Sequence, residues 1–316
     1  MRFAIVGAGA MGSVVGAHLA RAGHPVTLVD VDEQHIGAIQ RDGLRVQGWP
    51  EGEVVVPIQG TTDPSSLDTV DAMIFLCKGW ATRDAAAGVA HALAPDGWAI
   101  TIQNGLGNDR ILGEVVGVDR TVPGTTTVGA MKNEPGVVIM SPGTAAGESL
   151  THVGPPRSAT TIPAGVLEVA ATMTAAGLPT EALPDADEVI WTKLAMAASM
   201  GCLTAALRRT VKDVIDDEWA YGLWQDMFDE IMSVGAAEGV DLDAKAVFDH
   251  CDKTYRSVGH HVTSMAADVV AGRRTEIDSM ALEVARRGAD HGVPTPVVST
   301  IGRVVKSLES SYERAL

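Results

Sequence analysis

The sequence has little cysteine, few aromatic residues and no excess of basic residues. Its 316 residues include three cysteines, 4% aromatic residues, and 24 Lys and Arg against 40 Asp and Glu, which gives a formal net charge of −16. Cys77, Cys202 and Cys251 lie too far apart for a disulfide framework or a metal-ligand spacing, so we expect a reducing cytoplasm and no metal site. The negative charge argues against nucleic-acid backbones and anionic membrane surfaces as partners.

Long hydrophobic runs are also missing. The apolar run that follows Met1 is broken at once by glycines, and no other run reaches the length of a membrane span, so we expect neither a signal peptide nor a membrane helix. A hydrophobic content of 46% with 20% charged residues is typical of an ordinary globular protein. Because 316 residues exceed one comfortable core, the length predicts two domains.

The first half of the chain alternates short β-branched runs with alanine-rich stretches. Apolar runs bounded by turn residues are typical of strands buried on both faces. We expect strands at 2–6, 26–30, 72–77 and 99–103, helices at 11–22, 81–93 and 164–177, a turn at 95–97, and further strands with hairpin turns over 122–153. This alternation predicts an α/β domain with a Rossmann-type, doubly wound parallel sheet.

After Pro184 the pattern changes to helical periodicity. Asp185 and Asp187 are acidic residues of the kind that open a helix, because the helix dipole favours negative charge at its N-terminus. Beyond this first long helix, the periodicity predicts helices at 216–238, 243–257, 264–271, 275–291 and 295–314. The sequence therefore predicts an α/β domain over 1–184, followed by an all-α domain over 185–316.

A glycine-rich motif follows the first predicted strand and opens the first predicted helix. In such a motif the first glycine makes a tight turn, the second admits a pyrophosphate, and the third lets the helix pack on the strand. The free amides at the start of the helix would then bind the phosphates. The motif predicts a dinucleotide site formed by Gly7, Gly9, Ala10, Met11 and Gly12.

The end of the second strand carries an acidic residue that bears on cofactor choice. Asp30 lies where a carboxylate would hold the adenine ribose hydroxyls, and it would repel a 2′-phosphate. No lysine or arginine lies between Arg21 and Arg41 to bind that phosphate, so NAD is expected in preference to NADP, which stays possible. Asp32 and Glu33 are rival candidates, and an aspartate at a strand end can also simply cap a turn.

Two further strand ends carry polar residues. Ligands of such sheets lie beyond the carboxyl ends of the strands. There Lys78 could reach a phosphate or the nicotinamide ribose, and Asn104 could offer its amide to cofactor or substrate. The alternative for Asn104, which precedes Gly105, is that of a plain turn residue.

Lys193 lies in a helical stretch that is otherwise apolar or small. Burying an unpaired charge is costly, so such a lysine persists with partners or with a function. The alternative is an amphipathic helix from which the lysine extends to solvent. Opposite a nicotinamide, an ammonium would protonate the alkoxide that forms when a carbonyl is reduced.

Six motifs in order resemble those of the ketopantoate reductase family: GAGAMG at 7–12, CKGW at 77–80, QNGLGN at 103–108, WTKLA at 191–195, TSM at 263–265 and RTEID at 274–278. The resemblance covers essentially the whole chain. It implies a Rossmann domain, a helical domain with the active site in the cleft, and reduction of a 2-keto acid by a nicotinamide.

Carried over motif by motif, the resemblance implies a role for each of four residues. Lys193 would be the general acid, Asn104 would contact nicotinamide and substrate, Ser264 would bind the substrate carboxylate, and Glu276 would lie near the lysine and the substrate hydroxyl. A nearby carboxylate would keep the lysine charged despite burial. The alternatives are that Glu276 is a first-turn helix acid and Ser264 a helix cap.

The chain departs from the family on the lysine helix. The family usually has asparagines four and eight residues beyond the lysine, where this chain has Ala197 and Gly201. Because those amides hold the polar groups of ketopantoate, their loss implies a wider and less polar pocket and makes ketopantoate doubtful as the substrate. Relatives that oxidise branched or aromatic D-2-hydroxy acids with NAD then become attractive models. His260 and His261 are expected to line the altered pocket.

Three alternatives stay open at this point. The first is 2-dehydropantoate 2-reductase proper. The second is the β-hydroxyacid dehydrogenase family, which would require an asparagine four residues after the lysine and a glycine-rich segment near residue 120 that PGTTTVGA at 123–130 matches poorly. The third is a non-catalytic dinucleotide-binding sensor. The Ala-, Met- and Val-rich faces of the helical domain predict a homodimer.

Overall fold

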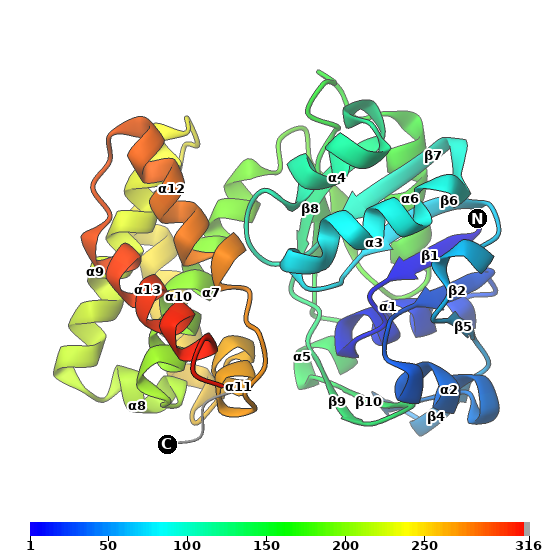
Figure 1. Cartoon of the computed structure of the whole chain (residues 1–316), viewed down its shortest axis with the longest axis horizontal. Helices are drawn as coiled ribbons and strands as arrows, with labels where there is room; N and C mark the ends of the chain where they lie inside the picture. Colours follow the sequence, from blue (N-terminus) through cyan, green and yellow to red (C-terminus); the bar gives the residue numbers. More distant parts are fainter. Residues whose placement is uncertain (313–316) are drawn as a thin grey trace. The chain divides into compact units, whose positions relative to one another are not determined.

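A computed structural model describes residues 1–312 in two compact units (Figure 1). The first unit comprises residues 1–103 and 108–186, and the second comprises residues 104–107 and the chain from Asp187 onward. The division therefore falls after Ala186, where the sequence predicted it after residue 184. The sequence did not predict that the short segment 104–107 would group with the second unit.

The first unit is built on an eight-stranded sheet. Six neighbouring strands are parallel, in the order β8-β7-β6-β1-β2-β5, while β11 is antiparallel to β8 and parallel to β12 at the edge. The strands are β1 Phe3–Val6, β2 Val26–Val29, β5 Gln59–Thr61, β6 Val70–Phe75, β7 Leu93–Thr101, β8 Thr121–Thr126, β11 Thr151–Val153 and β12 Thr180–Ala182. Strand β1 lies between β2 and β6, so the strands that follow β1 in the chain are added first on one side of it and then on the other. This confirms the expected Rossmann-type sheet.

The central strand is buried on both faces. Phe3 and Ile5 belong to an apolar cluster with residues of α1 and α6, whereas Ala4 and Val6 belong to a second cluster with residues of α3 and α4. Alternate residues of a strand point to opposite faces, so a run of four apolar residues is what a strand covered on both sides requires. The helices of this unit are α1 Ala10–Arg21, α2 Glu33–Asp42, α3 Thr82–Val89, α4 Asn108–Val116, α5 Pro142–Ala145 and α6 Ala164–Ala175.

A second, four-stranded sheet was not predicted. It has the order β4-β3-β10-β9, with strands β3 Leu44–Trp49, β4 Gly52–Val56, β9 Ala130–Glu134 and β10 Val137–Met140. It joins the region after α2 to the hairpin of β9 and β10, which lies about 90 residues further along the chain. The predicted turn at 95–97 is also wrong: these residues lie inside β7, where the register with β6 shifts between Leu93 and Trp98, so they form an irregular stretch within the strand and not its boundary.

Within residues 187–312 the second unit is all-α, as the sequence predicted, although α12 begins at Ala281 and not at Thr275 as expected. Its longest helix, α7, is packed against α9, α11 and α13. The helices are α7 Asp187–Leu207, α8 Val211–Ile215, α9 Glu218–Ala237, α10 Ala244–Val258, α11 Ser264–Val270, α12 Ala281–His291 and α13 Pro296–Glu309. The predicted end of the last helix at Arg314 lies outside the described residues.

Helix α7 is long and apolar enough to cross a membrane by length and composition, which the sequence reading did not anticipate. Within its most apolar window, 67% of the residues are buried inside the fold. A helix that is apolar on all sides is typical of the core of a protein when its neighbours cover it, as α9, α11 and α13 do here. We therefore interpret α7 as the core helix of the second unit.

Candidate active site

The glycine motif lies at the carboxyl end of β1, and each glycine has a distinct reason to be there. Gly7 has φ +100°, and a Cβ at this position would overlap the backbone of Cys77. A Cβ at Gly12 would overlap the carbonyl oxygen of Gly7, so this glycine lets α1 pack on the turn. At Gly9, in contrast, an added Cβ would meet no atom within 4 Å. Gly9 therefore borders open space.

The start of α1 is suited to bind an anion. Gly9 is the N-cap residue, it offers no side chain to cap the first amides, and the first turn, which contains Ala10, Met11 and Gly12, has no acidic residue. A helix start of this kind presents N–H groups and a positive dipole end to a phosphate. The open space beside Gly9 and these amides fit a pyrophosphate, so the residues present fit the dinucleotide that the motif predicts.

The end of β2 contains a cluster of charged residues. Asp30 accepts a hydrogen bond from the backbone N–H of Asp32 at 3.0 Å, and Asp32 caps α2 by accepting from the N–H of His35. Lys132 of β9 donates to the Asp32 carboxylate at 2.6 Å, which holds the pKa of Asp32 below its usual range. The sequence reading found no basic residue near this strand end because Lys132 lies 100 positions from Asp32.

The ends of β6 and β7 are joined by a buried amide. Gln103 donates to the carbonyl oxygen of Cys77 at 2.6 Å and to the hydroxyl of Thr82 at 2.9 Å, and it accepts from Thr101 at 2.9 Å. Lys78 follows Cys77 directly as the N-cap residue of a short 3-10 turn. Sequence reasoning missed the role of Gln103, which fixes the backbone from which Lys78 and Asn104 extend.

Asn104 lies in the segment that groups with the helical unit. Leu106 donates its N–H to the carbonyl oxygen of Ser279 at 2.8 Å, and a Cβ at Gly105 would overlap that same carbonyl. Ser279 in turn donates its N–H to the carbonyl oxygen of Glu276. The structure thus brings the QNG and RTEID motifs, which are about 170 residues apart in the sequence, to the same place. The role of Asn104 toward cofactor or substrate stays a prediction.

Lys193 is half-buried on α7. Burial lowers its pKa, whereas the thiolate form of the nearby Cys251 on α10 would raise it. That thiol is uncharged at neutral pH, because burial raises the pKa of Cys251 to about 11. Within residues 1–312 no hydrogen bond or ion pair holds the ammonium of Lys193.

Glu276 is buried and precedes a short 3-10 turn, at Ile277–Ser279, without capping it by its side chain. The alternative of a first-turn helix acid is therefore wrong, because the next α-helix, α12, begins at Ala281. That Glu276 lies near Lys193 and the substrate hydroxyl stays a prediction.

Ser264 is exposed at the first position of α11. The cap of this helix is Thr263, which accepts from the N–H of Ala266 and bonds Thr204 of α7 at 2.8 Å. The hydroxyl of Ser264 is therefore not used for capping. His260 interacts with Thr210 at 3.2 Å, and burial lowers the pKa of His261.

Beyond Lys193, the face of α7 that contains Ala197 and Gly201 has no polar side chain at these two positions. Ala197 is half-buried, and a Cβ added at Gly201 would meet no atom within 4 Å. The next polar side chain along this face is Thr204, whose hydroxyl is hydrogen-bonded to the hydroxyl of Thr263 at the start of α11. Space for a larger ligand group thus exists beside Gly201.

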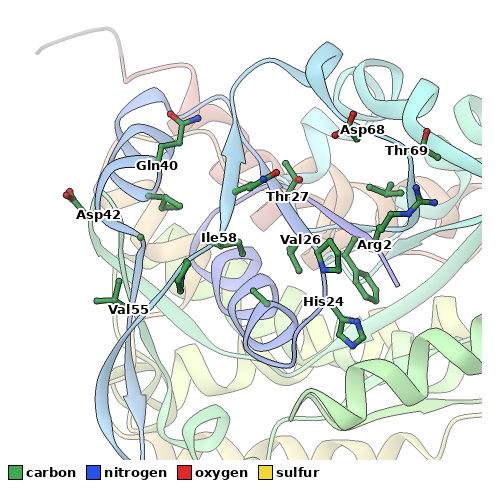
Figure 2. A pocket seen from close by; sticks show the side chains of 18 residues that line it. Arg2, His24, Val26, Thr27, Gln40, Asp42, Val55, Ile58, Asp68 and Thr69 are labelled. Atoms are coloured by element: carbon green, nitrogen blue, oxygen red, sulfur yellow. The ribbon is translucent and has the colours of Figure 1, made fainter.

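A pocket of about 680 Å³ lies at the amino ends of the strands of the main sheet. Its lining includes the first residues of β1, β2 and β6, so it opens at the amino ends of the strands, whereas the glycine motif lies at their carboxyl ends. Figure 2 shows Gln40 and Asp42 on one side and Asp68 and Thr69 on the other. Within residues 1–312 there is no group of three or more metal-ligating side chains.

Together these features define the class. A doubly wound sheet with a glycine-rich loop, followed by a helical unit with an unpaired lysine, is the architecture of a Rossmann-type oxidoreductase. The family model for ketopantoate reductase PanE/ApbA matches residues 3–157, and its C-terminal counterpart matches residues 185–309. The chain therefore belongs to the ketopantoate reductase family, and the expectation of an NAD(P)-dependent oxidoreductase acting on CH–OH is confirmed.

Individual relatives support this assignment. A 2-dehydropantoate 2-reductase of Halobacterium salinarum is 31% identical over 97% of this chain and 98% of its own length. Among solved structures, D-mandelate dehydrogenase with NADH and anilino(oxo)acetate has a TM-score of 0.91 at 25% identity, covering 99% of this chain and all of the other. A ketopantoate reductase of Ralstonia eutropha JMP134 has a TM-score of 0.88 at 27% identity, with the same coverage.

Proposed function

We propose that the protein interconverts a 2-keto acid and its 2-hydroxy acid, with Lys193 as the general acid and base. The observation that carries the proposal is the state of Lys193, whose pKa is lowered by burial and whose ammonium has no hydrogen-bond or ion-pair partner among residues 1–312. A general acid works best when its pKa lies near the working pH. A lysine held in a strong ion pair would give up its proton less readily.

The remaining site residues would bind and orient the ligands. Gly9 and the first amides of α1 would hold the pyrophosphate, and Lys78 the phosphate or ribose nearer the reaction centre. Ser264 has an exposed hydroxyl that could donate to the substrate carboxylate, and Asn104 an amide for the nicotinamide and substrate. When bound, the nicotinamide supplies or accepts the hydride. Lys193 gives a proton to the carbonyl oxygen as negative charge develops there, and Glu276 would contact the resulting hydroxyl.

NAD is the cofactor we propose. Asp30 lies at the end of β2, where a carboxylate would accept hydrogen bonds from ribose hydroxyls and repel a 2′-phosphate. The ammonium of Lys132 lies in the same cluster and would weaken the repulsion of a 2′-phosphate. It is, however, already hydrogen-bonded to the carboxylate of Asp32 at 2.6 Å. We therefore expect NADH to be used better than NADPH, with NADPH still accepted.

A 2-keto acid with a branched or aromatic side chain is the substrate class that the lysine helix favours. Ala197 and Gly201 offer no polar group, and the open space beside Gly201 would admit a bulky apolar substituent. His261 is a further candidate for lining this region. The similarity to D-mandelate dehydrogenase, which handles an aromatic hydroxy acid, supports the same class.

2-Dehydropantoate is the second candidate, because the relative from Halobacterium salinarum carries that name at 31% identity. A panel of 2-dehydropantoate, 2-keto-isocaproate and phenylglyoxylate, each run with NADH and NADPH, separates the two candidates. We expect higher kcat/KM for the two bulky apolar acids. A clear preference for 2-dehydropantoate would reject our choice of substrate class, and no oxidation of either cofactor with any of the three would reject the reaction.

The double substitution Ala197→Asn and Gly201→Asn sharpens this test. A site that hydrogen-bonds a substrate hydroxyl can discriminate by about 10⁴-fold or more against a substrate lacking it. We therefore expect the double variant to gain activity on 2-dehydropantoate and to lose activity on phenylglyoxylate. The matched control is Ala197→Leu with Gly201→Ala, which adds bulk without amides and should lower activity on all three acids.

The assembly and compartment that we propose are a homodimer in the cytoplasm. The helical unit exposes Trp219 and Leu223, which lie one turn apart on α9. An exposed apolar pair of this kind supports self-association, and light scattering of the purified protein tests it. The three free thiols, Cys77, Cys202 and Cys251, suit a reducing compartment.

A further inference from the structure

His35 is a fully buried histidine that the proposed mechanism does not use. It lies in the first turn of α2, and both of its ring nitrogens are engaged. The backbone N–H of Gly136, in the turn between β9 and β10, lies 2.9 Å from Nδ1, and the hydroxyl of Ser13 on α1 lies 3.0 Å from Nε2. Three segments that are distant in sequence therefore meet at one imidazole ring.

The direction of these hydrogen bonds follows from their chemistry. A backbone N–H can only donate, so Nδ1 of His35 accepts and the ring proton is on Nε2. Nε2 therefore donates to the hydroxyl of Ser13, which in turn donates to the carbonyl oxygen of Ala8 at 3.0 Å. Burial, helped by Lys132 and opposed by Asp32 and Asp30, lowers the pKa of His35, so the ring is neutral at pH 7.

The end of this chain of hydrogen bonds is the glycine loop itself. Ala8 lies between Gly7 and Gly9, and its carbonyl and the N–H of Gly9 belong to the same peptide unit. In a planar trans peptide the C=O and the N–H point in opposite directions. Holding the carbonyl of Ala8 against α1 therefore turns the N–H of Gly9 away from α1. That N–H has no partner within residues 1–312, and Gly9 borders open space.

We propose that His35 and Ser13 are positioning residues that aim the N–H of Gly9 at the cofactor pyrophosphate. The proposal rests on the dinucleotide site assigned above. The loop has only the methyl group of Ala8 as a side chain, so hydrogen bonds to its backbone must set its orientation. Apart from the bond from the Ser13 hydroxyl, two backbone hydrogen bonds among residues 1–312 hold the loop. The N–H of Gly7 donates to the carbonyl oxygen of Val29 at 2.8 Å, and the N–H of Ser13 donates to the carbonyl oxygen of Gly9 at 2.9 Å. Neither bond fixes the peptide between Ala8 and Gly9.

Three substitutions test the proposal on the full-length protein. Ser13→Ala removes the link to Ala8. His35→Asn retains an acceptor near the Nδ1 position for Gly136 but cannot reach Ser13, whereas His35→Gln retains a donor near the Nε2 position for Ser13. The dissociation constant for NADH is measured by fluorescence titration, and kcat and the KM for NADH are measured with the best substrate of the panel. Urea unfolding of each variant shows that it is folded.

We expect Ser13→Ala and His35→Asn each to raise the Kd and KM for NADH about tenfold, as the loss of a hydrogen bond or two would, and to leave kcat at saturating NADH unchanged. For His35→Gln we expect a Kd and a KM for NADH within about twofold of the wild-type values. The matched control is His152→Gln on β11, which replaces another histidine whose pKa burial lowers and should leave NADH binding unchanged.

Two results would overturn the assignment. One is wild-type NADH affinity in folded Ser13→Ala and His35→Asn. The other is equal weakening in His35→Asn and His35→Gln, since that would make packing of the ring, rather than the link through Ser13, the cause. If the wild-type protein itself binds neither NADH nor NADPH, the proposed cofactor site fails, and this inference fails with it.

Discussion

Gly9→Ala separates cofactor binding from folding within the glycine motif. Gly9 has φ −64° and ψ −164°, an extended conformation that alanine adopts without strain, and the new Cβ would meet no protein atom within 4 Å. Replacing a glycine at a compatible position stabilises a protein by about 0.4–1 kcal/mol, because the unfolded chain loses freedom. We therefore expect Gly9→Ala to unfold at the same urea concentration as the wild type or slightly higher.

The same methyl group would occupy the space assigned to the pyrophosphate. Forcing an extra methyl into a close contact costs about 1–3 kcal/mol. With about 1.4 kcal/mol for each factor of ten, this corresponds to a rise of about 5- to 150-fold in the Kd for NADH. Fluorescence titration with NADH measures the Kd, and urea unfolding measured in parallel gives the stability.

Gly12→Ala is the matched comparison, since its Cβ would overlap the carbonyl oxygen of Gly7 inside the protein. We expect this variant to lose stability by several kcal/mol, whereas Gly9→Ala loses affinity alone. A Gly9→Ala protein that binds NADH as tightly as the wild type would refute the reasoning, because it would show that no phosphate approaches the backbone at this point.

Three further predictions concern Lys193, Asp30 and His18. Lys193→Met should lower kcat by about 10²- to 10⁴-fold, the usual contribution of a general acid, and leave the Kd for NADH unchanged; a kcat near the wild-type value would exclude the proposed role. Asp30→Asn should raise the ratio of NADPH to NADH activity at least tenfold in steady-state assays, and an unchanged ratio would assign cofactor choice elsewhere. Burial lowers the pKa of His18, so the fold favours its neutral form, and the free energy of unfolding should fall as pH drops below about 6.5. His18→Asn, which can still donate to the carbonyl of Ala176, should flatten that dependence in urea titrations at pH 5 and 7; an unchanged slope would mean that other groups cause it.

Local patterns were sufficient to predict much of the first unit. The strand at Phe3–Val6, the glycine turn and helix α1 follow one another within 21 residues, so their geometry is encoded in a short stretch of sequence. Residues 44–61, in contrast, form β3, β4 and β5, which the sequence reading missed. These strands are short and mostly polar or exposed, and β3 finds one of its partners, β10, about 90 residues later.

The polar contacts of the site were even less accessible to sequence reasoning. Lys132 meets Asp32 and Gly136 meets His35 across about 100 residues, and no local spacing signals either contact. Gln103 was part of a recognised motif, but its role as a link between two strand ends depends on Cys77 and Thr82 being brought beside it by the sheet. Pairings of this kind are consequences of the tertiary fold, and a single sequence carries no pattern for them.

The grouping of residues 104–107 with the helical unit has a consequence for protein engineering. The backbone passes between the two units after Gln103, after Gly107 and after Ala186, so no single cut separates them. A chimaera that joins residues 1–186 of this chain to the helical half of a relative would give Leu106 a foreign partner in place of Ser279. Exchange of substrate preference between relatives should therefore succeed when the four residues 104–107 travel with the helical half.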